Sequence, residues 1–361
     1  MTRDQAATLV AAWATAVTDR DAAAHDRIWA DGTGIAPDAL RDNLFALPLA
    51  EFAATPAPED LHPGGIDVDV TWRLDHESVA ARHRLRLATT AGTAAEPKLA
   101  TLRTPPGEVD LLTPQWYEER LTVERSDHVV VLAGRDQAPT RWHAVLEPAL
   151  AVAGMRVGRD VGTVTVQAPA TEAVLAQLIG AELGPDATWA ALCRPVGRGS
   201  PAPVRLLLHP VRAGAMTDPE RAALMRHEAV HLLTDSPRSS LPLWVEEGYA
   251  EAVTWADDDA GGWRQAEPLL AELAAGGQPA WPPTDGEFGG AAAARAYALA
   301  WSGCRWLLEV AGWPELRRWY DLQAPVDGTA GIDEIAALQQ VYGITDAQRR
   351  ERWAAWLGER T

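Results

Sequence analysis

Positive charge is scarce in this sequence. Lys98 is its single lysine, and 32 lysines and arginines stand against 50 aspartates and glutamates, which gives a formal net charge of −18 at pH 7. A protein that binds nucleic acid needs a basic patch or stripe. Anionic membrane surfaces also attract basic segments. The composition therefore argues against a nucleic-acid partner and against binding to an anionic membrane.

Cysteine and long apolar runs are scarce as well. Cys193 and Cys304 are the two cysteines, and they match no metal-binding or redox spacing, so we expect two buried thiols in a reducing compartment. No run of about 18 apolar residues occurs, so no membrane span is predicted. The first residues carry acidic side chains within their apolar run, which favours an amphipathic helix over a signal peptide. We therefore expect a cytoplasmic protein.

The length of the chain predicts two domains. Its 361 residues exceed what a single hydrophobic core usually supports. A hydrophobic content of 47% and a charged content of 23% are ordinary for a globular protein. Polar residues and a proline at positions 137–140 separate a series of predicted strands from a new predicted helix. We therefore expect domains at residues 1–138 and 139–361.

HEAVH at residues 227–231 is the strongest chemical signal in the sequence. On a helix, His227 and His231 project from one face about one turn apart. That separation suits two ligands of one tetrahedral zinc, and Glu228 lies beside them, able to reach a water on the metal. Glu247, sixteen residues beyond His231, offers a third ligand and leaves the fourth position open, as in catalytic zinc sites.

The helix that this motif requires is signalled independently. Thr217, Pro219 and Glu220 form a capping box with proline in the first turn, and a run rich in Ala, Leu and Met follows. Two simpler interpretations stay open. The motif can arise by chance, and the glutamates that follow residue 245 can be a solvated acidic face.

HEAVH followed by LPLWVEEGYAE resembles the gluzincin metallopeptidases, in particular the peptidase-MA-like group. The resemblance implies one zinc per chain, with His227, His231 and Glu247 as its ligands. It also implies that Glu228 is the general base and that Glu251 orients a ligand histidine. The expected substrate is a peptide or protein. The loop between the two motifs is shorter than in the large aminopeptidases, and no GxMEN-like segment lies upstream, so an aminopeptidase is not implied.

Gluzincins often add a tyrosine or histidine that stabilises the oxyanion of the tetrahedral intermediate. Tyr297 lies on a predicted helix placed like the tyrosine-bearing helix of related proteins, so the resemblance implies it as this donor. The alternative is that Tyr297 is a core residue. Tyr249 is two residues from Glu247 and points to the other side of its helix. Glu246 is expected outside the ligand set.

Residues 204–209 are predicted as a strand whose entry is flanked by Pro201 and Pro203, as suits a sheet edge. In gluzincins the edge strand before the HExxH helix pairs with an extended peptide. The resemblance therefore implies substrate capture by main-chain hydrogen bonds at this strand.

The N-terminal residues predict helices followed by an antiparallel sheet. Helical spacing covers residues 4–30, with a break near residues 19–21, and residues 36–47. Alternating patterns then predict strands at residues 66–74, 79–88, 99–102, 116–123 and 129–132. This order resembles the cone-shaped α+β fold of nuclear transport factor two and SnoaL-like proteins. A ligand site within this cone is not expected.

The second domain is expected to hold a small sheet, the HExxH helix and a helical C-terminal subdomain, which makes the whole chain α+β. Ten of the 16 tryptophans lie after residue 243, and we expect them to form a core. The Gly- and Pro-rich residues 275–290 are predicted as a mobile loop.

The expected function is a zinc metallopeptidase of gluzincin type. One alternative is a binding or regulatory protein whose gluzincin-like module keeps zinc but no longer cleaves. Another is a structural zinc that joins two helices, which would require a fourth protein ligand.

Overall fold

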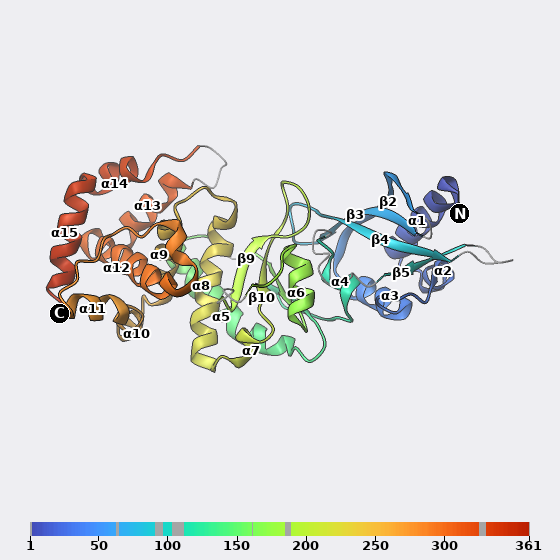
Figure 1. Ribbon diagram of the computed structural model, residues 1–361, viewed down its shortest axis with the longest axis horizontal. Coiled ribbons are helices and arrows are strands. Elements are labelled where there is room, and N and C mark those ends of the chain that lie inside the picture. The colour runs from blue at the N-terminus through green and yellow to red at the C-terminus, as the bar shows by residue number, and fades with distance from the viewer. Residues whose placement is uncertain are drawn as a thin grey trace. The chain divides into compact units, whose positions relative to one another are not determined.

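The computed structural model describes residues 2–62, 65–90, 97–102, 112–160, 162–184, 189–324 and 330–360. Helices and two five-stranded sheets make up these ranges, so the fold class is α+β, as predicted (Figure 1). No helix in the described ranges is long and apolar enough to cross a membrane. The contacts divide the chain into two compact units.

Unit 1 comprises Met1–Ala144, Gly162–Gly184 and Trp189–Ala215, and unit 2 comprises Val145–Val161, Pro185–Thr188 and Met216–Thr361. The expected division at residues 138 and 139 lies close to the first of these changes. The contact-based division nevertheless assigns two later segments, Gly162–Gly184 and Trp189–Ala215, to unit 1. The predicted domain boundary and the contact-based division therefore differ.

The first sheet of unit 1 has the order β1-β5-β4-β3-β2. Neighbouring strands are antiparallel except for β1 and β5, which run parallel. Its strands are β1 (Trp29–Ala30), β2 (Leu49–His62), β3 (Gly65–Leu74), β4 (Ala81–Thr90) and β5 (Lys98–Thr101). The predicted strands at residues 66–74, 79–88 and 99–102 are confirmed. β2 was missed, although its side chains alternate between exposed and buried from Glu51 to Ala54.

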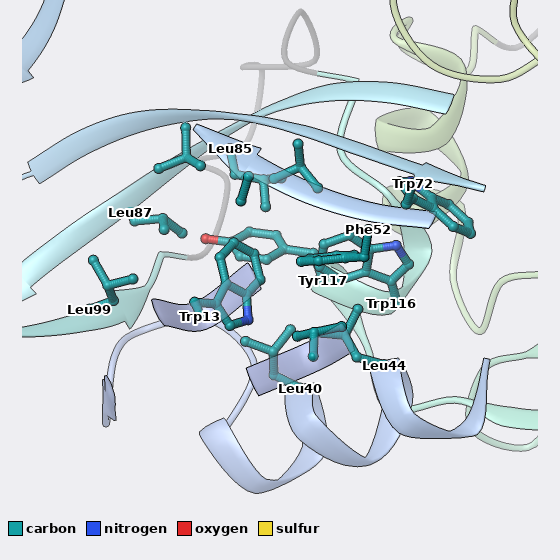
Figure 2. Close-up of a cluster of buried hydrophobic side chains, with 14 of the residues drawn as sticks. Trp13, Leu40, Leu44, Phe52, Trp72, Leu85, Leu87, Leu99, Trp116 and Tyr117 are labelled. Atoms are coloured by element: carbon teal, nitrogen blue, oxygen red, sulfur yellow. The ribbon is translucent and has the colours of Figure 1, made fainter. Parts of the chain in front are cut away.

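Three helices pack on this sheet, and aromatic side chains form part of the core between the helices and the strands. They are α1 (Arg3–Thr18), α2 (Ala22–Ile28) and α3 (Pro37–Ala46). The predicted helix break is confirmed, because the Asp21 side chain caps α2 by accepting a hydrogen bond from the backbone N–H of Ala24. Figure 2 shows Trp13, Phe52 and Trp116 gathered between the helices and the strands. The ring centroids of Trp13 and Phe52 lie 5.2 Å apart.

The second sheet of unit 1 has the order β6-β7-β8-β10-β9. Its strands are β6 (Thr122–Arg125), β7 (Val129–Ala133), β8 (Val164–Ala168), β9 (Ala191–Pro195) and β10 (Val204–Leu208). Three helices occur in the same parts of the sequence as these strands. They are α4 (Gln115–Glu118) before β6, α6 (Glu172–Ile179) between β8 and β9, and α7 (Arg212–Ala215) after β10.

Two predictions for residues 116–132 were wrong. Residues 116–118 lie in α4 instead of a strand, and β6 and β7 belong to the second sheet instead of the first. Periodicity detects a strand but carries no information on which strand it pairs with. Because β7 pairs in parallel with β8, a boundary at residues 138 and 139 falls between two neighbouring strands of one sheet.

The prediction that residues 204–209 form a sheet edge was also wrong. β10 lies between β8, with which it is parallel, and β9, with which it is antiparallel. Both of its backbone edges are therefore occupied, and it cannot pair with an extended peptide. Pro201 and Pro203 precede the ladder, so they do not interrupt it. The buried run from Arg205 to Leu208 is typical of an interior strand.

A buried ion pair connects β10 to the turn that follows β3. Arg205 is fully buried, and its Nε and Nη2 atoms lie 2.8 and 3.0 Å from the two carboxylate oxygens of Glu77. The guanidinium also stacks 4.1 Å from the ring centroid of Trp72. Burial alone would raise the pKa of Glu77, but the charge and hydrogen bonds of Arg205 lower it below 4.5.

Replacing Glu77 with glutamine should lower the free energy of unfolding by about 3–5 kcal/mol, because the buried Arg205 charge loses its partner. Because the pKa of Glu77 is lower in the folded than in the unfolded protein, the ion pair contributes its full stability above the ordinary carboxyl pKa. This contribution to stability is lost as the pH falls through the pKa of Glu77 in the folded protein. Urea unfolding at neutral and acidic pH measures both effects. Glu51→Gln is the control, because Glu51 pairs with Arg73 at 3.5 Å while half exposed. Equal destabilisation by the two variants would contradict the prediction.

Unit 2 is helical. Helix α5 (Pro139–Val157) begins in unit 1 and continues into it. The helices that follow are α8 (Asp218–Thr234), η1 (Ser236–Arg238), α9 (Leu243–Thr254), α10 (Asp259–Gln265), α11 (Glu267–Ala274), η2 (Asp285–Phe288), η3 (Gly290–Ala292), α12 (Ala293–Ala311), α13 (Trp313–Gln323), α14 (Glu334–Tyr342) and α15 (Asp346–Gly358). The predicted helical subdomain is confirmed. Within residues 275–290, the described structure includes the short helix η2.

Seven of the ten tryptophans of unit 2 are buried and form a core, in line with the prediction. Trp281 lies at its centre, with ring centroids 5.0 Å from Trp244, 5.4 Å from Trp353 and 5.9 Å from Trp306. The buried guanidinium of Arg349 stacks 4.8 Å from the centroid of Trp281. Through Trp281 this packing joins α9, which carries Trp244, to α12, which carries Trp306.

Candidate metal centre

Helix α8 carries the HEAVH motif and begins where the sequence predicted. Thr217 and Glu220 form the capping box, and Pro219 lies in the first turn. The helix ends at Asp235, which adopts a left-handed conformation (φ 54°, ψ 28°) and donates its backbone N–H to the carbonyl of His231. The motif therefore occupies the last two turns of a helix that is fixed at both ends.

Helix α9 packs against both α8 and α12 (Figure 1). It carries Glu246, Glu247 and Glu251, and α12 carries Tyr297. Gly248 lies at the crossing of α9 and α12, where an added Cβ would come within 2.6 Å of the Ala300 carbonyl oxygen. The close approach of these two helices therefore requires glycine immediately after Glu247.

Three ligand atoms converge between α8 and α9. Nε2 of His227 lies 2.9 Å from Nε2 of His231 and 3.0 Å from Oε2 of Glu247. Nε2 of His231 lies 3.6 Å from the same oxygen. The three residues form a cluster that could hold a metal ion. The histidines and the glutamate that the sequence selected are therefore brought together.

The dimensions of this cluster suit zinc. Bonds of about 2.0–2.1 Å in tetrahedral geometry place the ligand atoms about 3.3 Å apart. The three distances, from 2.9 to 3.6 Å, lie on both sides of that value. Two imidazole nitrogens with one carboxylate oxygen are also a donor set that zinc takes at catalytic sites. The residues present therefore fit the ion that the motif implies.

The outer nitrogen of His227 has a carboxylate partner. Its Nδ1 lies 3.1 Å from Oε1 of Glu251, the residue that the sequence placed in this role. Oε2 of Glu251 in turn accepts a hydrogen bond of 2.6 Å from the Trp255 indole. Burial alone would lower the pKa of His227, but its hydrogen bonds to Glu247 and Glu251 raise the pKa well above 6.5. Protons therefore compete with a metal for this site as the pH falls.

The outer nitrogen of His231 has two partners that sequence reasoning missed. Its Nδ1 lies 2.8 Å from Oγ of Ser236 and 3.4 Å from Oε1 of Glu246. Glu246 lies outside the ligand set, as expected, but it contacts the far side of a ligand histidine. Its only sequence signal was its position beside Glu247, and Ser236 carried none.

Glu228 is 5% exposed and sits between the two histidines in the sequence of α8. Its carboxylate is close enough to contribute to the raised pKa of His231, which burial alone would lower. Glu228 is therefore placed within electrostatic range of the cluster.

Tyr297 also lies at the cluster. Its ring centroid is 6.3 Å from that of His227 and 5.2 Å from that of Phe288. Burial raises the pKa of the Tyr297 phenol, and the carboxylates around it, first of all that of Glu247, raise it further. The phenol therefore stays protonated across the physiological range and can act as a hydrogen-bond donor.

The site residues selected from the sequence thus lie on three helices of unit 2 and surround one small volume. Searches found no family model and no curated protein that matches this chain.

Proposed function

We propose that this chain is a zinc-dependent hydrolase, most plainly a metallopeptidase of gluzincin type that cleaves a peptide or protein substrate. The observation that carries the proposal is the convergence of His227, His231 and Glu247 at mutual distances of 2.9–3.6 Å. The buried carboxylate of Glu228 beside them supplies the base that hydrolysis needs.

The proposed mechanism gives separate roles to zinc, to its three protein ligands, to Glu228 and to Tyr297. Zinc, when bound, supplies a Lewis acid that polarises the scissile carbonyl and activates water. His227 and His231 would hold it through a ring nitrogen each, and Glu247 would hold it through a carboxylate oxygen. Glu228 accepts the proton of the attacking water and returns it to the leaving amine. Tyr297 donates its hydroxyl proton in a hydrogen bond to the oxyanion that forms.

Replacing Tyr297 with phenylalanine should lower turnover about 10²–10³-fold, the usual loss when one oxyanion donor is removed. Zinc content should not change, because Tyr297 is not among the proposed ligands. Peptide hydrolysis and metal analysis measure the two quantities. Tyr249→Phe is the matched control, since Tyr249 is buried against Tyr320 with ring centroids 4.3 Å apart. If Tyr297→Phe keeps wild-type turnover, Tyr297 is a core residue only.

The proposal as a whole is tested by metal analysis of the purified protein together with a peptide-library digest. One zinc per chain and cleavage of library peptides support it. A protein without a bound transition metal would rule it out. A protein that holds zinc but cleaves nothing would instead favour the binding or regulatory alternative.

For the N-terminal part we propose the cone-shaped fold of nuclear transport factor two and SnoaL-like proteins. The support is the arrangement of α1, α2 and α3 around a mainly antiparallel sheet with an aromatic core. The proposal concerns the fold alone, because a fold of this kind does not determine a function.

A further inference from the structure

His231 presents its two ring nitrogens to different surroundings. Nε2 faces the ligand atoms of His227 and Glu247 at 2.9 and 3.6 Å, and Nδ1 faces Ser236 at 2.8 Å. An imidazole binds a metal through the lone pair of one nitrogen, and the other nitrogen then carries the proton. Zinc binding at this cluster therefore needs His231 with its proton on Nδ1.

Ser236 connects this proton to a carboxylate. Its Oγ lies 2.8 Å from Nδ1 of His231 and also 2.8 Å from Oε1 of Glu246. The Ser236 hydroxyl donates its single proton to Glu246, so its oxygen accepts from Nδ1 of His231. The two hydrogen bonds then run in one direction, from the imidazole through the hydroxyl to the carboxylate. That direction places the proton of His231 on Nδ1 and leaves Nε2 free for a metal.

The backbone holds Ser236 in this place. The left-handed turn at Asp235 ends α8 and directs the chain back toward the helix, so that Ser236 reaches a side chain five residues earlier. The Asp235 carboxylate accepts hydrogen bonds of 2.8 and 3.0 Å from Arg238, at the other end of η1. Ser236 itself is only 1% exposed, so water does not compete for its hydroxyl.

The two ligand histidines are supported differently. His227 contacts the carboxylate of Glu251 directly at 3.1 Å, whereas the closest partner of the His231 Nδ1 is a hydroxyl. The Ser236 hydroxyl accepts a hydrogen bond from the imidazole and donates one to Glu246, and each of these hydrogen bonds strengthens the other. The hydrogen bond from the imidazole also fixes the plane of the ring.

We propose that Ser236 is a positioning residue of the metal centre: together with Glu246 it fixes the tautomer and the ring orientation of His231. The inference rests on the proposed function, because it concerns the same zinc site.

The test compares zinc affinity, measured by competition with a chelator, among the full-length wild type and the variants Ser236→Ala, Ser236→Thr and Ser240→Ala. Ser236→Ala should bind zinc roughly tenfold more weakly, the usual loss when the partner of a ligand is removed. Ser236→Thr keeps a hydroxyl and should recover most of this loss. Ser240 is exposed in the same loop, so its replacement should leave the affinity unchanged.

A second readout follows the Nδ1 proton of His231 by NMR in the zinc-loaded protein labelled with ¹⁵N-histidine. In the wild type this proton should be protected from exchange with water, and in Ser236→Ala it should exchange faster. Unchanged affinity and exchange in Ser236→Ala, or a threonine variant as weak as the alanine variant, would overturn the positioning role. An unprotected proton in the wild type would overturn it without any variant. A wild type that binds no zinc would instead defeat the proposed function, and this inference with it.

Discussion

Replacing Glu228 with glutamine is expected to lower peptide hydrolysis about 10³-fold while zinc stays bound. Glutamine has nearly the shape of glutamate, but its amide cannot accept a proton from water. The three converging ligand atoms belong to other residues, so the metal site keeps its donors. Turnover should therefore fall while zinc content stays the same. That result is expected for a general base and not for a metal ligand.

The measurement pairs a kinetic assay on a library-derived peptide with metal analysis of the same sample. Glu267→Gln is the control, because Glu267 is exposed at the start of α11. If Glu228→Gln hydrolyses the peptide at the wild-type rate, Glu228 is not the base. If the variant loses zinc instead, its carboxylate holds the metal and the assignment of roles must change.

Replacing Glu247 with alanine should weaken zinc binding by more than the 10–100-fold typical of an outer partner, because a direct ligand is lost. Glu247 contributes the sole carboxylate oxygen of the cluster, 3.0 and 3.6 Å from the two ring nitrogens. The nearby charges of His231 and His227 outweigh burial and hold the pKa of Glu247 well below its usual range. The side chain is therefore ionised while the two histidines carry their protons, and a metal must displace those protons to bind.

Thermal unfolding provides a readout of this loss that does not need activity. Zinc at about 1,000 times its dissociation constant stabilises a folded protein by about 4 kcal/mol, so the melting temperature of the wild type should rise when zinc is added to chelator-treated protein. Glu247→Ala should show little of this rise, and Glu267→Ala should show all of it. An equal rise in Glu247→Ala and the wild type would mean that zinc binds elsewhere.

Much of the candidate metal centre could be predicted because it depends on local rules. The capping box at Thr217 starts α8, and helical periodicity alone places His227 and His231 on one face. Glu247 needed more, since a loop separates it from the motif. The sequence offered it as a third ligand on a second predicted helix, and the resemblance implied the same residue. The packing of α9 on α8 gives the distance.

Other contacts had no local signal. Ser236 reaches His231 because Asp235 adopts a left-handed conformation without being glycine, the residue that usually announces such a turn. The pairing of strands was equally hidden. β10 was taken for an edge from the prolines that precede it, and β6 and β7 were assigned to the wrong sheet. Periodicity reports which residues face a core, but it does not report the neighbouring strand.

The sequence by itself determined the net negative charge, the α+β class, the helix of the HEAVH motif and the choice of its two histidines. These follow from composition and from interactions within a few residues. The tertiary structure decided which oxygen of Glu247 lies near the Nε2 atoms of the two histidines and which groups contact their Nδ1 atoms. It also decided where Tyr297 lies. Those contacts join residues on separate helices, and their geometry is fixed by the packing of side chains such as the tryptophan core around Trp281, which no local pattern specifies.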